Sequence, residues 1–214
     1  MTIAQSPARA ARLDLTEHSV YTPPGTASTV DSPHASRFTI YSNYDCRLPS
    51  EAFVTEAELK NHLDAAEKSP KQIAAAVLGL PEKTLRYKPS PDKWCILEIL
   101  GHLADMEILY AYRIRQMLAD KDPVIAPIDQ DAWAKNLGYL ESSPPELIAL
   151  YGLNRHANVG LLRRLNAEGL QKSARHPELD HRVTVADYVR MMAKHGPNHL
   201  EQIERLKRET VGKQ

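Results

Sequence analysis

The chain has 214 residues, of which 43% are hydrophobic, so its length allows one domain of about 150 residues with an appended segment. Lys and Arg together number 27, as do Asp and Glu, and this balance leaves no basic excess for binding a phosphate backbone. No apolar run approaches the roughly 20 residues of a membrane-spanning helix. The 2 cysteines are too few for a disulfide framework or a cysteine-rich zinc module. Composition therefore favours a soluble globular protein of the reducing cytoplasm, with neither nucleic acid nor a membrane as its partner.

Residues 1–54 differ in composition from the rest of the chain. Five prolines interrupt them, Ser and Thr are frequent, and no helical stripe persists. A short strand at residues 37–41 would bury little surface by itself. We therefore expect residues 1–54 to form an irregular, flexible leader and residues 55–214 to form the folded domain.

From Thr55 onward, apolar residues recur with helical spacing. The pattern predicts four long amphipathic helices over residues 55–78, 95–119, 144–168 and 185–208. A short helix capped by Asp129 is expected between the second and the third of them. Because no segment shows convincing strand alternation, we predict an all-α four-helix bundle. About 20 residues separate the second long helix from the third, which allows a long crossing connection rather than a simple up-and-down topology.

The fourth long helix carries two histidines on its inward face. That face consists of residues spaced by three and four: Val185, Tyr188, Met192, His195, His199, Gln202 and Leu206. His195 and His199 lie one turn apart, so both imidazoles can reach one metal ion. His102 borders the apolar face of the second helix and can supply a third ligand. Three protein ligands leave further coordination positions for water or substrate, which is typical of reactive rather than structural metal sites.

Three segments, in this order, resemble motifs of the DinB / YfiT-like superfamily: residues 93–105 (KWCILEILGHLAD), 129–133 (DQDAW) and 195–203 (HGPNHLEQI). The resemblance spans roughly residues 55–207. It implies a four-helix bundle, often dimeric, that holds one divalent metal through His102, His195 and His199. Gly196 stands where relatives often have Asp, and Cys95 stands where they usually have a Ser helix cap.

Other polar residues near these histidines are weaker candidates. Glu98 and Asp105 lie one turn before and one turn after His102, so either could receive the second N–H of a ligand imidazole. Glu98 could instead cap the helix that starts after Cys95, and Asp105 could be a solvated helix acid. His156 could line the cavity from the third helix, although polar neighbours predict a solvated flank.

Two further kinds of residue have simpler explanations than chemistry at the site. Asp129 and Asp131 could ligate a metal, but capping of the short helix is the favoured explanation. Cys95 could be a nucleophile near a helix N-terminus, but it lies about 10 Å from His102 along the helix and is better explained as a cap substitute. The chain therefore offers no well-placed thiol of its own.

These features predict a metal-dependent enzyme that uses one divalent ion, zinc or nickel, and a small-molecule substrate. Characterised relatives imply thiol-dependent S-transfer, in which a low-molecular-weight thiol adds to an electrophile, or metal-assisted hydrolysis. The resemblance also allows a homodimer. The alternative is a non-catalytic metal-binding stress or interaction protein, in which a fourth protein ligand closes the site.

Overall fold

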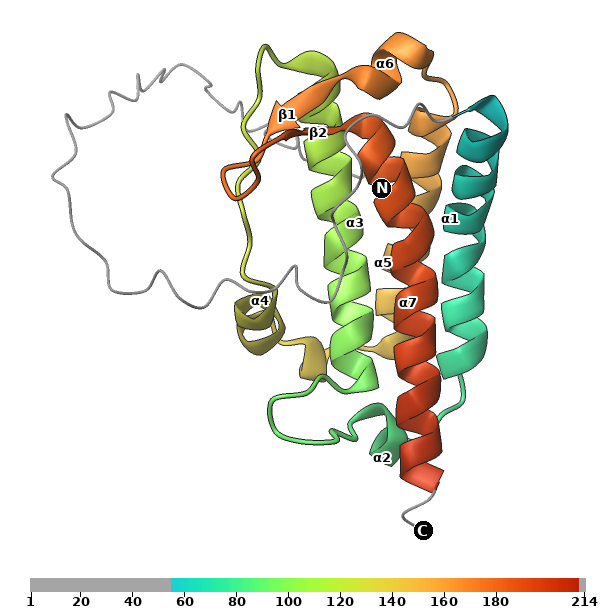
Figure 1. The fold of residues 1–214 in the computed structure, drawn as a ribbon. Helices are drawn as coiled ribbons and strands as arrows, with labels where there is room; N and C mark the ends of the chain where they lie inside the picture. The colour runs from blue at the N-terminus through green and yellow to red at the C-terminus, as the bar shows by residue number, and fades with distance from the viewer. Residues whose placement is uncertain (1–54, 212–214) are drawn as a thin grey trace, which may run out of the picture. The chain divides into compact units, whose positions relative to one another are not determined.

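The computed structural model describes residues 55–211, so the predicted leader and its boundary at residue 54 lie outside the described residues. Four long helices form a bundle: α1 (Glu56–Val77), α3 (Ile96–Ala119), α5 (Pro144–Leu162) and α7 (Val185–Val211) (Figure 1). The prediction of an all-α four-helix bundle is confirmed. Within the described residues, no helix is both long enough and apolar enough to cross a membrane.

Reciprocal side-chain caps stand at the starts of α1 and α7, next to the residues where the sequence predicts these helices to begin. At the start of α1, the backbone N–H of Thr55 donates to the Glu58 carboxylate and the backbone N–H of Glu58 donates to the Thr55 hydroxyl. Thr184 and Asp187 make the same reciprocal pair at the start of α7. Such caps satisfy N–H groups that the first turn of a helix leaves without partners, which explains why these two boundaries are sharp.

Pro70 lies inside α1 without ending it. A proline has no N–H, so the carbonyl of Ala66, four residues earlier, loses its helical partner. The Ser69 hydroxyl donates to that carbonyl at 2.8 Å, and Arg155 of α5 donates to it at 3.0 Å. The freed carbonyl is thus satisfied within the protein, and the helix continues to Val77.

The long helices pack in a ring in which α1 contacts α5 and α7, and α3 contacts the same two helices. Figure 1 shows α3 and α5 running in the same direction, so the chain between them returns along the bundle. This connection contains α4 (Gln130–Asn136) and the short 3-10 helix η2 (Tyr139–Glu141). Tyr139 packs against Gly101 near the start of α3, where a Cβ would lie 2.3 Å from the ring, and its hydroxyl donates to Asp105 at 2.6 Å. The connection is therefore fixed against the first half of α3.

The structure corrects the sequence prediction near the end of the third long helix. The predicted helix over 144–168 ends at Leu162, because the side chain of Asn166 accepts a hydrogen bond from the backbone N–H of Gly169 and caps a separate short helix, α6 (Ala167–Gln171). A two-stranded antiparallel hairpin follows, in which β1 (Ser173–Arg175) pairs with β2 (Arg182–Thr184). Strands of three residues are too short to show a recognisable alternation.

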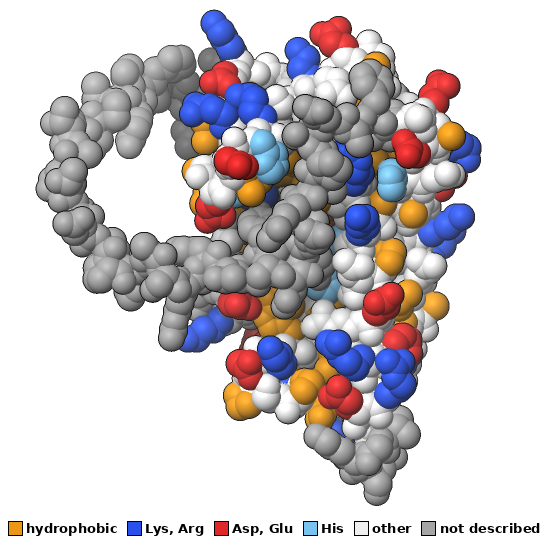
Figure 2. All heavy atoms as spheres, in the orientation of Figure 1, with side chains coloured by type: hydrophobic (Ala, Val, Ile, Leu, Met, Phe, Trp, Pro, Cys, Tyr) orange, Lys and Arg blue, Asp and Glu red, His pale blue; other side chains and the backbone are white. Residues whose placement is uncertain are grey.

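The smaller elements cover the two ends of the bundle. The hairpin and α6 lie at one end in Figure 1, and α2 (Glu82–Leu85) lies at the other. Buried aliphatic and aromatic side chains fill the space between the long helices. On the face that Figure 2 shows, acidic and basic side chains of the described residues are interspersed and neither charge dominates.

Candidate metal centre

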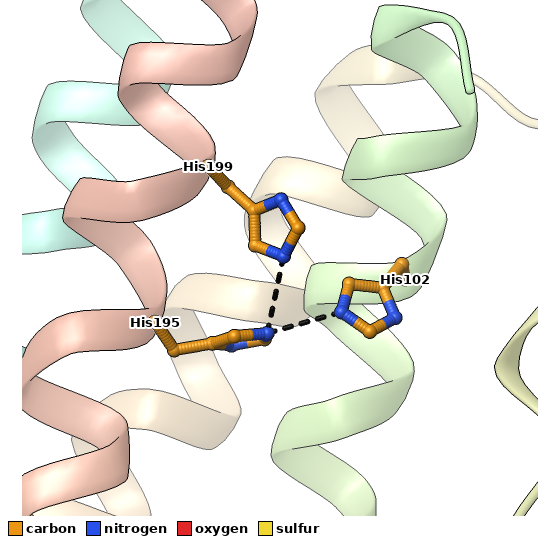
Figure 3. A group of neighbouring side chains, drawn as sticks. All are labelled: His102, His195 and His199. Atoms are coloured by element: carbon orange, nitrogen blue, oxygen red, sulfur yellow. Dashed lines mark hydrogen bonds between the residues drawn. The ribbon is translucent and has the colours of Figure 1, made fainter. Parts of the chain in front are cut away.

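His102, His195 and His199 converge between α3 and α7 (Figure 3). The His102 Nε2 lies 3.0 Å from the His195 Nε2, and the His199 Nε2 lies 3.2 Å from the same atom. All three side chains are buried, with exposed fractions of 4%, 5% and 2%. The helical spacing of four residues explains the pair on α7, and the packing of α3 against α7 brings in the third ring.

The donor set fits a divalent metal ion. Ligand nitrogens about 2.0–2.1 Å from a tetrahedral ion are about 3.3 Å apart. Two separations in this cluster are 3.0 and 3.2 Å, and all three nitrogens lie within 4.8 Å of one another. The His199 Nδ1 lies 3.0 Å from the side-chain oxygen of Gln202. Because that oxygen can only accept, Nδ1 carries the proton and the lone pair of His199 stands on Nε2, which faces the other two histidines. Gln202 thus selects the tautomer that a metal ion requires.

Burial also keeps these imidazoles neutral. It lowers the pKa of His102 and His195 well below the ordinary value, and a proton on one neighbouring imidazole disfavours a proton on the next. Burial lowers the pKa of His199 from 6.5 to about 4. At neutral pH, where the lone pair of each ring is available, proton competition for a metal ion is therefore weak.

The depressed pKa of His199 predicts that the metal-free protein loses stability on acidification. Above pH 6.5 the ring is neutral in both states, but between pH 6.5 and about 4 only the unfolded chain takes up the proton. Melting temperatures of the metal-free protein should therefore fall across this window. A His199→Gln variant, which cannot titrate there, should show a smaller fall, and an equal fall in both proteins would contradict this explanation.

Close packing of the helices explains why a glycine, Gly196, lies between the paired histidines. A Cβ at Gly196 would lie 2.4 Å from the Cβ of Ser69 and 2.9 Å from the hydroxyl of Tyr151. A larger side chain, such as the Asp that the family resemblance leads one to expect, would not fit, because α1 and α5 approach α7 too closely here. Gly196 therefore belongs to the close packing behind His195.

A Gly196→Ala variant is expected to be less stable by about 1–3 kcal/mol, because the added methyl group overpacks a closed contact. Gly152 on α5 is a matched control, since the nearest atom to a Cβ there is 3.7 Å away. Gly152→Ala should be neutral or stabilising by up to about 1 kcal/mol, since alanine favours the helix. Urea unfolding of both variants measures the difference, and equal free energies of unfolding would exclude the steric explanation.

The weaker candidates have other partners. The Glu98 carboxylate accepts from the backbone N–H of Cys95 at 2.9 Å and from the Lys88 ammonium at 2.6 Å, so it caps α3. Asp105 accepts the hydroxyl of Tyr139. The structure therefore gives neither acid a hydrogen bond to a ligand imidazole among the described residues. The capping explanation fits Glu98. The expectation of a solvated helix acid is wrong for Asp105, because its carboxylate is half-buried and bonded to the Tyr139 hydroxyl. His156 is exposed and lines a groove between α1 and α5 with Lys68 and Pro70, away from the three histidines.

The two aspartates at the start of the short helix α4 have different hydrogen-bond partners. Asp129 accepts the backbone N–H of Ala132 at 2.9 Å and is the N-cap of α4, as the sequence predicts. Asp131 is not a cap: its carboxylate accepts the indole N–H of Trp94 at 3.0 Å. Neither belongs to the cluster of potential metal ligands within residues 55–211.

Sequence reasoning missed a buried polar network beside the site. The polar neighbours of His156 suggested a solvated flank, but Arg155 and Asn158 are buried with exposed fractions of 0% and 1%. The Arg155 guanidinium donates to the carboxylate of Glu107 at 2.6 Å and to the carbonyl of Met192 at 3.0 Å. The Asn158 amide donates to the other oxygen of Glu107 at 3.1 Å. The network joins α3, α5 and α7 one turn from His195.

Comparison with known proteins agrees with this arrangement. The sequence pattern that defines the DinB superfamily matches residues 65–203, which include all three histidines. The chain belongs to the DinB superfamily. A relative from Bacillus cereus strain 03BB102 is 25% identical over 169 residues, which are 77% of this chain and 96% of the relative. A relative from Oceanobacillus iheyensis is 24% identical over 153 residues, covering 72% of this chain and 88% of its own length. Both carry the name "Putative metal-dependent hydrolase".

The fold also resembles that of a solved structure. YfiT from Bacillus subtilis, described as a probable metal-dependent hydrolase with an unusual four-helix bundle topology, superposes with a TM-score of 0.71. The match covers 77% of this chain and 93% of YfiT at 21% sequence identity. The match to the DinB superfamily over residues 65–203 confirms the family that the three motifs suggest, and the likeness to YfiT supports the four-helix bundle.

Proposed function

We propose that this DinB superfamily protein is a metal-dependent enzyme in which His102, His195 and His199 hold one divalent ion. The observation that carries the proposal is the convergence of three buried, neutral imidazoles from two helices on one point. Imidazole suits both zinc and nickel. When bound, an ion with three uncharged ligands would supply Lewis acidity that lowers the pKa of a water molecule or a thiol.

The chain's own residues prepare the ligands for this role. Gln202 holds the proton of His199 on Nδ1, so Nε2 is left for the ion. Gly196 allows α7 to lie close to Ser69 and Tyr151, which fixes the backbone beside His195. The low exposure of all three imidazoles removes bulk water from their nitrogens, and electrostatic effects on a bound reactant are stronger in such surroundings.

The names of the curated relatives favour hydrolysis, in which water is the nucleophile. Transfer of a low-molecular-weight thiol onto an electrophile is the second reaction that this site could support. Cys95 is unsuited to be the nucleophile in either reaction, because it is buried and burial raises the pKa of its thiol. In a thiol transfer, the thiol would therefore have to be a cosubstrate.

The test uses protein purified without a chelating tag and loaded with one equivalent of zinc or nickel. Activated esters and amides are supplied alone, and electrophiles are supplied with and without a low-molecular-weight thiol. We expect turnover that requires the metal and is lost in His195→Ala, whereas the exposed His156→Ala keeps it. Turnover without thiol supports hydrolysis, and turnover only with thiol supports transfer. Stoichiometric metal without turnover in either assay would favour the non-catalytic alternative.

A further inference from the structure

Trp94 connects one candidate ligand to a distant part of the chain. Its indole lies just before α3 and packs against the ring of His102, with centroids 4.8 Å apart and planes tilted by 52°. Aromatic pairs in such tilted arrangements attract each other, because the positive edge of one ring meets the negative face of the other. The orientation of the His102 imidazole is therefore coupled to that of the indole.

The indole N–H of Trp94 has its hydrogen-bond partner on α4. The Trp94 Nε1–H donates to the carboxylate of Asp131 at 3.0 Å, across 37 residues of sequence. Asp129 already caps α4, so Asp131 is not needed for that purpose. The indole is thus held by its N–H on one side and contacts His102 through its ring.

The three histidines differ in what orients them. His195 and His199 share α7, whose spacing sets their separation, and Gln202 orients the ring of His199. His102 comes from another helix, so its ring has to be placed independently. Among residues 55–211, the Trp94 ring is the aromatic neighbour of His102 outside the cluster. A small rotation of that indole would change where the His102 Nε2 points.

We propose that Asp131 is a positioning residue for the metal centre, acting through Trp94 on His102. The inference rests on the proposed function, because it requires the three histidines to hold a metal ion. Partners that contact ligands directly affect metal affinity by about 10–100-fold, and Asp131 acts one residue further out. Loss of its hydrogen bond should therefore weaken zinc binding by about 3- to 10-fold.

Two substitutions separate the hydrogen bond from the charge. Asp131→Ala removes the acceptor and the negative charge in the first turn of α4, whereas Asp131→Asn removes only the charge and keeps an amide oxygen that can accept the indole N–H. Both are made in a Trp133→Phe background, which leaves Trp94 as the only one of the 2 tryptophans. Zinc affinity is measured by competition with a chromophoric chelator, and Trp94 emission is recorded with and without zinc.

We expect the parent and Asp131→Asn to bind zinc alike and to show the same zinc-dependent change in Trp94 emission. Asp131→Ala should bind more weakly and emit at longer wavelength before zinc is added, because its indole is released. Equal affinities in all three proteins would overturn the role of Asp131 while leaving the metal site intact. Equal losses in both variants would assign the effect to the charge on α4 and also overturn it. A parent that binds no zinc would overturn the proposed function and this inference together.

Discussion

A His199→Ala protein is expected to bind its divalent metal at least about 100-fold more weakly than the wild type while remaining folded. Outer partners of a ligand alone affect affinity by about 10–100-fold, so removal of one of three ligands should do more. The apolar seams of the four long helices do not depend on the metal, and the substitution relieves the crowding of three buried imidazoles. Metal content and helical circular dichroism, measured on the same sample, test both halves of this expectation.

The controls separate a catalytic metal from a structural one. His156→Ala removes an exposed histidine and should change neither metal content nor melting temperature. Chelator-treated wild type should stay helical, as we also expect of His199→Ala. If both metal-poor proteins unfold at ambient temperature, metal binding supplies the free energy that keeps the protein folded. The ion then has a structural role.

Glu107→Leu is expected to lower the free energy of unfolding by about 3–5 kcal/mol, because it leaves the Arg155 guanidinium buried without a counter-charge. Both side chains of this ion pair have an exposed fraction of 0%, and their N–O distance is 2.6 Å. The loss would be a large part of the roughly 5–15 kcal/mol that keeps a domain folded. Denaturant unfolding followed by circular dichroism measures it.

Two further variants show whether burial is the cause. Glu67→Leu breaks an ion pair of similar length, 2.7 Å to Arg163, in which the side chains are 36% and 46% exposed. Exposed pairs contribute about 0–1 kcal/mol, so this variant should be nearly neutral. The double variant Glu107→Leu/Arg155→Met removes both buried charges and should recover most of the loss. Equal destabilisation by Glu67→Leu and Glu107→Leu would show that burial of the pair is not decisive.

The sequence predicts the bundle and the histidine cluster because both leave local signals. Capping pairs such as Thr184 with Asp187 mark where helices begin, and helical spacing shows which face is buried. Two histidines one turn apart within a buried seam stand out against this pattern. The third ligand, His102, needs the family motif as well, because a single histidine beside an apolar stripe carries no such signal.

The polar network and the Trp94 contact leave no local signal. From the sequence alone, Arg155 is predicted to be solvated, because an analysis of helical periodicity assigns charged residues to the exposed face. Its partners Glu107 and Ala66 are 48 and 89 residues away in the chain, so only the packed helices bring them together. Asp131 and Trp94 are likewise 37 residues apart and meet because the chain after α3 returns along the bundle.

The most direct test of the central claim is a crystal structure of the protein loaded with one equivalent of zinc, with data collected at the zinc absorption edge. We predict one anomalous peak between α3 and α7, about 2.0–2.2 Å from the Nε2 atoms of His102, His195 and His199. A zinc peak held by other residues, or a zinc-loaded crystal in which any of these three imidazoles turns away from the ion, would contradict the assignment of this site.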